Sequence, residues 1–277
     1  MMIDDEVAVV RAERLSPSFV RVELGGPCLA DFGVDGPLYD QRIKLVFPGD
    51  QRRTYTVRDV RGEGAATRLV VDLVVHDDAH GDLGPACRWA RGAAAGDRLG
   101  LLAPRRGAAF GGIEFDPGTA RRLLLAGDET ALPAIAAILE QLPGSATGAA
   151  FVEVPHPDDV QAIRHPAGME VCWLPRGDEP HGDRLRAAVL DHLGVGRAPV
   201  EEETEIDPDL WETPTYSSSG EDVGVGPGRR LLDLYAWIAG ESAVVTGLRR
   251  VLVRELGVDR RQVAFMGYWR RGTAMKG

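Results

Sequence analysis

Cysteine is scarce in this sequence. Three cysteines occur in 277 residues, at Cys28, Cys87 and Cys172. They lie far apart, are odd in number and form no C-x-x-C pair, so neither a disulfide framework nor a zinc or iron–sulfur site is indicated. We therefore expect a reducing compartment and no bound metal.

Long apolar stretches are absent as well. No run approaches the ~18 apolar residues that a transmembrane helix requires. The N-terminus, Met-Met-Ile-Asp-Asp-Glu, is acidic and lacks the apolar core of a signal peptide. These absences predict a soluble cytoplasmic protein without a membrane partner.

Lysine is the third scarcity, since it occurs only at Lys44 and Lys276 among 32 basic residues. The formal net charge is -10 and the pI is about 5.1. Nucleic acids and membrane surfaces are polyanions that such a protein repels at long range, so we expect neither as a partner. An anionic ligand must instead be held by local basic groups.

The first hundred residues contain short alternating or β-branched runs, separated by clusters of Gly, Pro and Asp. This pattern is typical of a small antiparallel barrel. A single short helix is expected after Gly84-Pro85, because proline suits the first helical turn. The expected strands are Phe19–Leu24, Arg42–Phe47, Arg53–Val60, Arg68–Val75 and Arg98–Leu102.

From about Thr119 apolar strands alternate with longer helical segments, which predicts an α/β domain with a mainly parallel sheet. The chain is long enough for two domains, expected at 1–118 and 119–277 with Pro104–Gly118 as the linker. Residues 197–228 cannot bury much apolar surface and are expected to form an irregular excursion. The expected strands are Leu123–Ala126, Gly148–Val154, Met169–Leu174, Leu234–Ile238 and Val263–Phe265, and the expected helices are Ala131–Leu142, Asp183–His192 and Ser242–Leu256.

Residues 53–58, Arg-Thr-Tyr-Thr-Val-Arg, carry the most informative pattern. On a strand Arg53 and Tyr55 share one face, which puts a guanidinium beside an aromatic ring, as a flavin diphosphate requires. In this interpretation Tyr55 packs on the isoalloxazine, Thr56 hydrogen-bonds near its reactive edge, and Arg53 pairs with the pyrophosphate. Taken alone, the stretch fits an ordinary edge strand about as well.

Two neighbouring segments bear on the same site. Gly84-Pro-Ala-Cys-Arg-Trp89 offers backbone N–H groups at a helix start, a natural seat for a pyrophosphate. By itself the segment also fits a plain strand-to-helix turn. The run Leu69–Val75 followed by His76 is, in isolation, a core strand with a histidine at its end.

Residues 126–133, Ala-Gly-Asp-Glu-Thr-Ala-Leu-Pro, lie between a strand and a helix, where a phosphate-binding loop belongs, but they lack G-x-G-x-x-G. Asp128 and Glu129 make the turn acidic, which repels phosphate unless they face a ribose or cap the helix at Thr130. Both interpretations stay open. Residues 237–242, Trp-Ile-Ala-Gly-Glu-Ser, repeat the strand–turn–helix pattern.

Together with Asp72-Leu-Val-Val-His76, Tyr235-Ala-Trp-Ile-Ala-Gly-Glu241 and Gly267-Tyr-Trp-Arg270, these segments occur in an order that resembles the siderophore-interacting proteins, a flavoprotein branch of the ferredoxin-reductase-like family. The resemblance covers nearly the whole chain. It implies an antiparallel FAD-binding β-barrel domain followed by a parallel-sheet domain that binds NADH or NADPH. It also implies a ferric-siderophore reductase, in which NAD(P)H reduces FAD and single electrons then reduce chelated Fe(III), releasing Fe(II).

The resemblance also implies a set of site residues, none of which is a nucleophile or general base. The FAD-binding residues are Arg53, Tyr55, Thr56, Val57, Arg58, Asp72, Val74, His76, Gly84, Pro85, Ala86, Cys87 and Trp89. Those at the nicotinamide nucleotide, expected to enter between the two domains, are Asp128, Glu129, Thr130, Gly240 and Glu241. Those that attract an anionic ferric siderophore are Lys44, Arg250 and Arg270.

Three alternatives remain at this stage. A general NAD(P)H:flavin or diaphorase-type reductase would share the fold but lack a basic pocket over the flavin, so Lys44 and Arg270 distinguish it. The missing G-x-G-x-x-G also leaves room for a non-enzymatic flavin- or chelate-binding protein. A ferredoxin is the alternative electron donor.

Overall fold

The computed structural model describes residues 2–76, 84–195, 210–218 and 233–272, which divide into two compact units. The barrel unit contains the described residues up to Ile113 together with Ala136–Gln141. The sheet unit contains Glu114–Ile135 and the described residues from Leu142 onward. The domain boundary at residues 118 and 119 stays a prediction.

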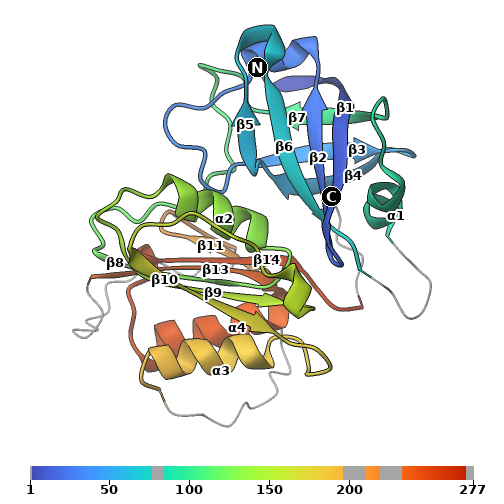
Figure 1. The fold of residues 1–277 in the computed structure, drawn as a ribbon. Coiled ribbons are helices and arrows are strands. Elements are labelled where there is room, and N and C mark those ends of the chain that lie inside the picture. Colours follow the sequence, from blue (N-terminus) through green and yellow to red (C-terminus); the bar gives the residue numbers. More distant parts are fainter. Residues whose placement is uncertain (1, 77–83, 196–209, 219–232, 273–277) are drawn as a thin grey trace. The chain divides into compact units, whose positions relative to one another are not determined.

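The barrel unit is an antiparallel half-barrel of seven strands in the order β4-β3-β7-β1-β2-β6-β5 (Figure 1). One α-helix, α1 (Pro85–Gly92), follows β6 along the chain, and short 3-10 helices span Pro27–Asp31 and Gly64–Ala66. The strands are β1 (Ile3–Ser16), β2 (Phe19–Gly25), β3 (Arg42–Phe47), β4 (Gln51–Thr56), β5 (Asp59–Arg61), β6 (Arg68–Val74) and β7 (Arg98–Ala103).

Alternation along the strands builds the core of the barrel unit. On β3 the side chains of Ile43, Leu45 and Phe47 are buried, whereas Lys44 between them is exposed. Successive side chains of a strand point to opposite faces, so the sequence alternation predicted this core correctly. Phe47 also meets the ring of Trp89 edge-on at 5.4 Å, which packs α1 against β3.

Two features of the barrel unit differ from the expectation. The longest strand, β1, was not predicted, because many of its residues are charged and its buried side chains, among them Val7 and Val9, are few. The single strand expected over Arg53–Val60 is two strands. Of these, β4 pairs with β3 and β5 pairs with β6.

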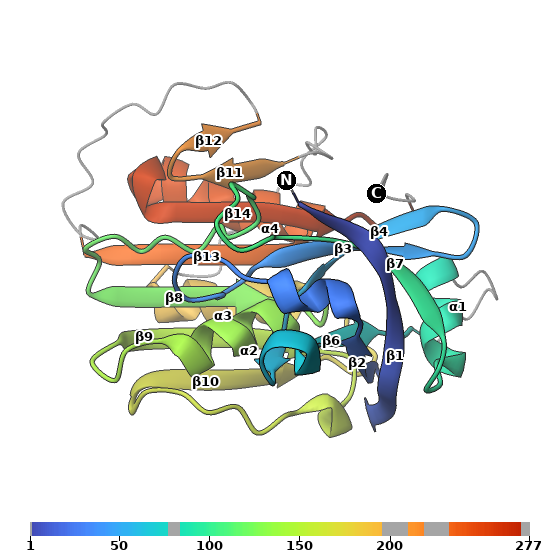
Figure 2. The ribbon, with the colours of Figure 1, turned by 90° about the horizontal axis from the view of Figure 1, so that it is seen from above.

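The sheet unit has seven strands in the order β10-β9-β8-β13-β14-β11-β12, seen side by side in Figure 2. The first five are parallel, as predicted, and their carboxyl ends share one edge, which we call the carboxyl edge. In Figure 1, α3 and α4 lie on the same face of this sheet. The strands are β8 (Arg122–Gly127), β9 (Thr147–Val154), β10 (Gly168–Pro175), β11 (Trp211–Thr213), β12 (Tyr216–Ser217), β13 (Leu234–Glu241) and β14 (Val263–Trp269), and the helices are α3 (Asp183–His192) and α4 (Ser242–Arg249). Helix α2 (Leu132–Gln141) begins in this unit and belongs to the barrel unit from Ala136 onward.

Three details of the sheet unit differ from the expectation. Within the excursion predicted at 197–228, the described residues 210–218 form β11 and β12, and β11 pairs with β14; the rest of that prediction lies outside the described residues. The expected helix Ser242–Leu256 is α-helical only to Arg249 and continues as a π-helix over Arg250–Glu255. Strands β13 and β14 run on to Glu241 and Trp269, so the motif Tyr235–Glu241 lies inside β13 and the motif Gly267–Arg270 lies inside β14 except for Arg270.

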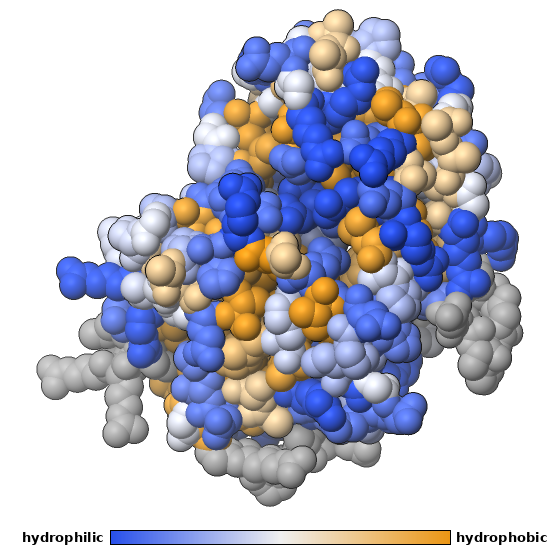
Figure 3. Space-filling model, viewed as in Figure 1, coloured by the Kyte–Doolittle hydropathy of each residue, from blue (hydrophilic) through white to orange (hydrophobic). Residues whose placement is uncertain are grey.

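In the face drawn in Figure 3, hydrophobic groups are scattered among hydrophilic ones. Large exposed apolar side chains in the described part of the chain are limited to Met2, Val10, Val160 and Tyr216. None of the described helices is both long and apolar enough to cross a bilayer.

Candidate functional site

Strand β4, the end of β6 and the start of α1 come together in the barrel unit. Tyr55 on β4 is half-buried and meets Phe47 edge-on at 6.1 Å, while the neighbouring Thr56 and Val57 are buried. Burial raises the pKa of the Tyr55 hydroxyl above its ordinary value. The structure therefore gathers an aromatic ring and a hydroxyl side chain beside the helix start that the sequence singled out.

The start of α1 is a candidate anion site. Its N-cap is Gly84, followed by Pro85 in the first turn, and no described side chain caps the first-turn N–H groups near Ala86 and Cys87. Helix geometry leaves these groups without intrahelical partners, and a phosphate is a natural acceptor for them. A Cβ atom built on Gly84 would meet nothing within 4 Å. These residues fit the pyrophosphate of FAD.

The end of β6 is tied to this helix. The backbone N–H of His76 donates to Cys87 Sγ at 3.4 Å, and Arg91 Nη2 donates to the His76 carbonyl at 2.8 Å. Val74, two residues earlier, is half-buried. The residues expected on the second flavin strand and on the helix thus form one local structure.

The three charged side chains expected at the flavin differ in how accessible they are to a ligand. They are Arg53, Arg58 and Asp72. Arg53 is half-buried, and its Nη1 donates to the Arg52 carbonyl at 2.7 Å. Arg58 is only 9% exposed, and its guanidinium makes two hydrogen bonds to Glu140, which belongs to the same unit. The buried Asp72 accepts two bonds from Arg21 at 2.6 and 2.7 Å. Arg58 and Asp72 therefore support the strands through internal ion pairs.

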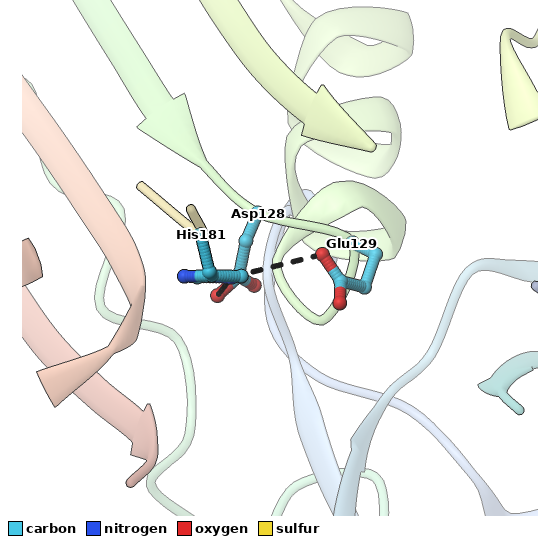
Figure 4. A group of neighbouring side chains, drawn as sticks. All are labelled: Asp128, Glu129 and His181. Carbon is cyan, nitrogen blue, oxygen red and sulfur yellow. Dashed lines mark ion pairs between the residues drawn. The ribbon is translucent and has the colours of Figure 1, made fainter. Parts of the chain in front are cut away.

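A second polar group occupies the carboxyl edge of the sheet unit, with Asp128 at its centre (Figure 4). The Asp128 carboxylate accepts from Trp269 Nε1 and from the Glu241 backbone N–H, each at 2.9 Å. It also accepts from the backbone N–H and hydroxyl of Thr130, at 2.9 and 2.5 Å. His181 Nε2 lies 3.2 Å from Asp128 Oδ2. One buried carboxylate thus joins the ends of β8, β13 and β14.

Gly240 is required by this arrangement. Its φ of +141° lies in a region that side-chain-bearing residues rarely adopt, and a Cβ atom there would stand 2.6 Å from Asp128 Oδ2. Next to it, Glu241 caps α4 by accepting from Ala243 and Val244 backbone N–H groups at 2.7 and 3.2 Å. The structure therefore brings Asp128, Thr130, Gly240 and Glu241 together, as the motifs suggested.

Glu129 belongs to the same network and pairs with Arg176. Both of its carboxylate oxygens accept from the Arg176 guanidinium, at 2.7 and 2.9 Å, and Glu153 Oε1 lies 3.6 Å from Arg176 Nη1. Asp128 and Glu129 are each only 1% exposed. The sequence left open whether these carboxylates face a ribose or cap the helix at Thr130. In the structure Asp128 accepts from Thr130, and Glu129 forms an internal salt bridge with Arg176.

Asp128, Glu129 and His181 place ligand atoms within 4.8 Å of one another, a spacing that could suit a metal ion. The acceptor positions are already used, however. Arg176 holds both oxygens of Glu129, and Asp128 accepts from Trp269 and the Glu241 backbone. A cation would have to displace these donors, so the group is better described as an internal ionic network.

The network perturbs two pKa values in opposite directions. Burial by itself would raise the pKa of Asp128, but His181 and the donors from Thr130 and Trp269 outweigh it and bring the pKa to about 2. Burial would lower the pKa of His181, but the neighbouring carboxylates of Asp128 and Glu129 raise it above its ordinary value despite the charge of Arg176. The imidazolium is thereby favoured.

These shifts predict how stability depends on pH. A folded-state pKa below the ordinary 3.8 of Asp128 adds stability that is lost as the pH falls through about 2. A folded-state pKa above the ordinary 6.5 of His181 adds stability that is complete below pH 6.5 and is lost as the pH rises through the folded value. Wild type should therefore lose more unfolding free energy than His181→Gln between neutral and alkaline pH, measured by urea denaturation. Parallel curves for the two proteins would contradict a charged His181.

The residues expected to attract the substrate belong to two different units. Lys44 is exposed on β3 of the barrel unit, whereas Arg270 directly follows β14 at the carboxyl edge of the sheet unit. Arg250 follows α4, which begins at the carboxyl edge and runs away from it. The structure does not group Arg250 with Arg270.

Sequence reasoning missed four members of the carboxyl-edge network: Glu153, Arg176, His181 and Trp269. One signal was available. Arg176 and His181 follow the expected strand Met169–Leu174, so they belong at the edge where parallel strands end. Trp269 lay within a motif that we identified, but nothing local indicates that its indole reaches Asp128.

Two family models match the chain. One, described as siderophore-interacting protein, matches residues 120–272. The other, described as siderophore-interacting FAD-binding domain, matches residues 8–52 and 49–108. A Mycobacterium tuberculosis protein is 35% identical over 95% of this chain and 89% of its own length. The ferric vibriobactin reductase ViuB of Vibrio cholerae is 30% identical over 95% of this chain and 88% of its own length.

Solved structures agree with these matches. A siderophore utilization protein from T. fusca has a TM-score of 0.70 at 29% identity, covering 100% of this chain and 96% of that one. The siderophore-interacting protein SipS from Aeromonas hydrophila has a TM-score of 0.69 at 27% identity, covering 98% and 93%. The ferredoxin-NADP+ reductase of Plasmodium falciparum, at 10% identity with a TM-score of 0.62 and coverage of 95% of each chain, shares the fold.

Proposed function

Because the chain belongs to the siderophore-interacting protein family, we propose that it is a cytoplasmic ferric-siderophore reductase that passes electrons from NAD(P)H through FAD to siderophore-bound Fe(III) and releases Fe(II). The observation that carries the proposal is the open helix start of α1, beside Tyr55, in the part of the chain that matches an FAD-binding domain. Bound FAD would supply the step from two-electron to one-electron chemistry.

The barrel unit supplies the cofactor contacts in this proposal. The first turn of α1 after Gly84 holds the pyrophosphate through backbone N–H groups, and Arg53 adds a positive charge. Tyr55 packs on the isoalloxazine, and Thr56 hydrogen-bonds near its reactive edge. No side chain needs to act as nucleophile or general base, because only electrons and a hydride are transferred.

The substrate is bound by charge. Hard oxygen ligands favour Fe(III) over Fe(II), so reduction weakens the chelate and releases the iron. In a protein of net charge -10, an anionic chelate needs local positive charge. Lys44, exposed on β3, is the candidate in the barrel unit, and Arg270 is the candidate in the sheet unit.

Lys44→Ala should raise the KM for an anionic ferric tris-catecholate by about fivefold, as expected for the loss of about 1 kcal/mol of attraction between exposed charges. The effect should grow at low salt, because screening is then weaker. Reduction of FAD by nucleotide should be unchanged. Steady-state kinetics and stopped-flow flavin reduction measure the two half-reactions separately.

Two controls accompany this prediction. Arg11→Ala removes the same charge from an exposed position on β1, and a ferric trihydroxamate provides a neutral chelate. Arg11→Ala should change the KM for the tris-catecholate by much less than Lys44→Ala does. Lys44→Ala should likewise change the KM for the trihydroxamate by much less than the KM for the tris-catecholate. Equal losses with neutral and anionic chelates would reject the electrostatic role of Lys44.

A further inference from the structure

Three of the described α-helices begin at the carboxyl edge, and one of the protein's own carboxylates accepts a backbone N–H at the start of each or just before it. These carboxylates belong to Asp128 for α2, Glu153 for α3 and Glu241 for α4. All three are buried. An α/β domain usually holds the phosphates of a nucleotide at the starts of such helices. In this protein carboxylates already occupy those positions.

The start of α2 is filled completely. The Thr130 N–H donates to Asp128 Oδ1, and the Ala131 and Leu132 N–H groups donate to the Asp128 carbonyl at 3.0 and 3.1 Å. Pro133 has no N–H, and the next donor, Ala134, bonds to the Ala131 carbonyl. From residue 130 to residue 134, no backbone donor remains for a ligand.

The other two helices follow the same plan. Glu153 accepts from the Gly182 and Leu185 N–H groups at 2.8 and 3.1 Å at the start of α3. Glu241 accepts from the Ala243 and Val244 N–H groups at the start of α4. A phosphate approaching either helix would meet a fixed negative charge in the position where it should bind.

The start of α1 in the barrel unit is the opposite case. Its cap is Gly84, which has no side chain to fill the candidate anion site. A glycine thus stands at the start of the helix that is proposed to bind the FAD pyrophosphate. Carboxylates stand at the starts of α2, α3 and α4.

We propose that Asp128, Glu153 and Glu241 stand in for nucleotide phosphates, so that the sheet unit does not hold the pyrophosphate of the hydride donor at these helix starts. The protein then recognises the hydride donor through its dihydronicotinamide and the adjoining ribose. It therefore accepts reduced nicotinamides in general, with or without the adenylate half. This inference rests on the proposed reduction of FAD by a nicotinamide, in which a hydride leaves the dihydropyridine and the oxidised nicotinamide departs.

The direct test is a calorimetric titration of the FAD-loaded protein with ADP-ribose, which carries the adenosine and pyrophosphate without the nicotinamide. Each phosphate–backbone hydrogen bond that is absent is worth about tenfold in affinity, so we expect no saturation below about 1 mM. A dissociation constant of about 10 µM or tighter would overturn the inference. This titration needs no flavin reduction, so it decides the inference even if the proposed activity fails.

The proposed function is tested separately by stopped-flow flavin reduction with NADH and with reduced nicotinamide mononucleotide, which lacks the adenylate. The inference predicts second-order rate constants within about fivefold of each other, because the missing half contributes little binding. A loss of about 100-fold with the mononucleotide would contradict the inference and leave the function intact. No reduction by either donor would contradict the function.

A matched pair of variants tests whether the carboxylates are responsible. Glu241→Gln removes a negative charge from the start of α4, and Glu179→Gln removes one from an exposed ion pair with Arg184 in the same unit. ADP-ribose affinity should rise several-fold more in Glu241→Gln than in Glu179→Gln. Equal affinities, in proteins with equal unfolding midpoints, would contradict a local role for the helix-bound carboxylate.

Discussion

Gly84→Asp is expected to weaken FAD binding by about 100-fold or more while leaving the apoprotein at least as stable as wild type. Aspartate is a favourable N-cap residue, and a Cβ atom at position 84 has open space and an allowed φ of -55°. Its carboxylate would occupy the first-turn N–H groups of α1 and repel the pyrophosphate. The variant would lose two charge-assisted hydrogen bonds to the pyrophosphate, each worth about tenfold in affinity, which gives the expected factor of about 100. Fluorescence titration of the apoprotein with FAD measures the affinity.

Two substitutions at the same residue serve as controls. Gly84→Ala adds a Cβ without an acceptor and should retain FAD, because only the acceptor competes for the N–H groups. Gly84→Asn caps the helix without a charge and should lie between the two. An aspartate variant that purified with a full complement of FAD would show that the pyrophosphate is not held at α1.

Asp128→Ala is expected to destabilise the protein by about 3–5 kcal/mol, the cost of removing one partner of a buried ionic group. The change leaves the Trp269 indole, the Glu241 backbone N–H and His181 without their acceptor at a buried site. Urea unfolding followed by far-ultraviolet circular dichroism measures the loss. Asp128→Asn keeps one acceptor oxygen and should lose less.

The matched control for this prediction is Glu179→Ala, which removes a carboxylate from an exposed ion pair in the same unit. Exposed pairs contribute little, so its unfolding curve should overlay that of wild type. Should Asp128→Ala unfold at the same urea concentration as this control, the network would not be holding the strand ends together.

Periodicity made most of the fold predictable. Strand β3 alternates buried side chains with more exposed ones, strand β6 is mainly apolar and buried, and helix α3 was expected with the bounds it has. Strand β1 could not be predicted, because its pairing with β2 and β7 compensates for a sequence rich in charge. The hairpin of β11 and β12 depends in the same way on its pairing with β14.

In the candidate site, too, local features could be predicted from the sequence and long-range contacts could not. A glycine before a proline at a helix start is a local signal, so the candidate anion site at Gly84 could be proposed from sequence. The role of Asp128 could not be decided locally, because the capping interaction and a ribose contact use the same residue types. Its partner His181 is 53 residues further on and Trp269 is 141 residues further on, and only the fold brings them together.

The central claim is that this protein carries electrons from a reduced nicotinamide through FAD to siderophore-bound Fe(III). Its most direct test is the visible spectrum of the purified protein under anaerobic conditions, before and after addition of NADH or NADPH and then of a ferric siderophore, with a chromogenic Fe(II) chelator present. We expect the oxidised flavin spectrum to bleach with the nucleotide and to return with the siderophore as Fe(II) is trapped. A flavin that stays oxidised with either nucleotide, or that bleaches and yields no Fe(II), would contradict the account.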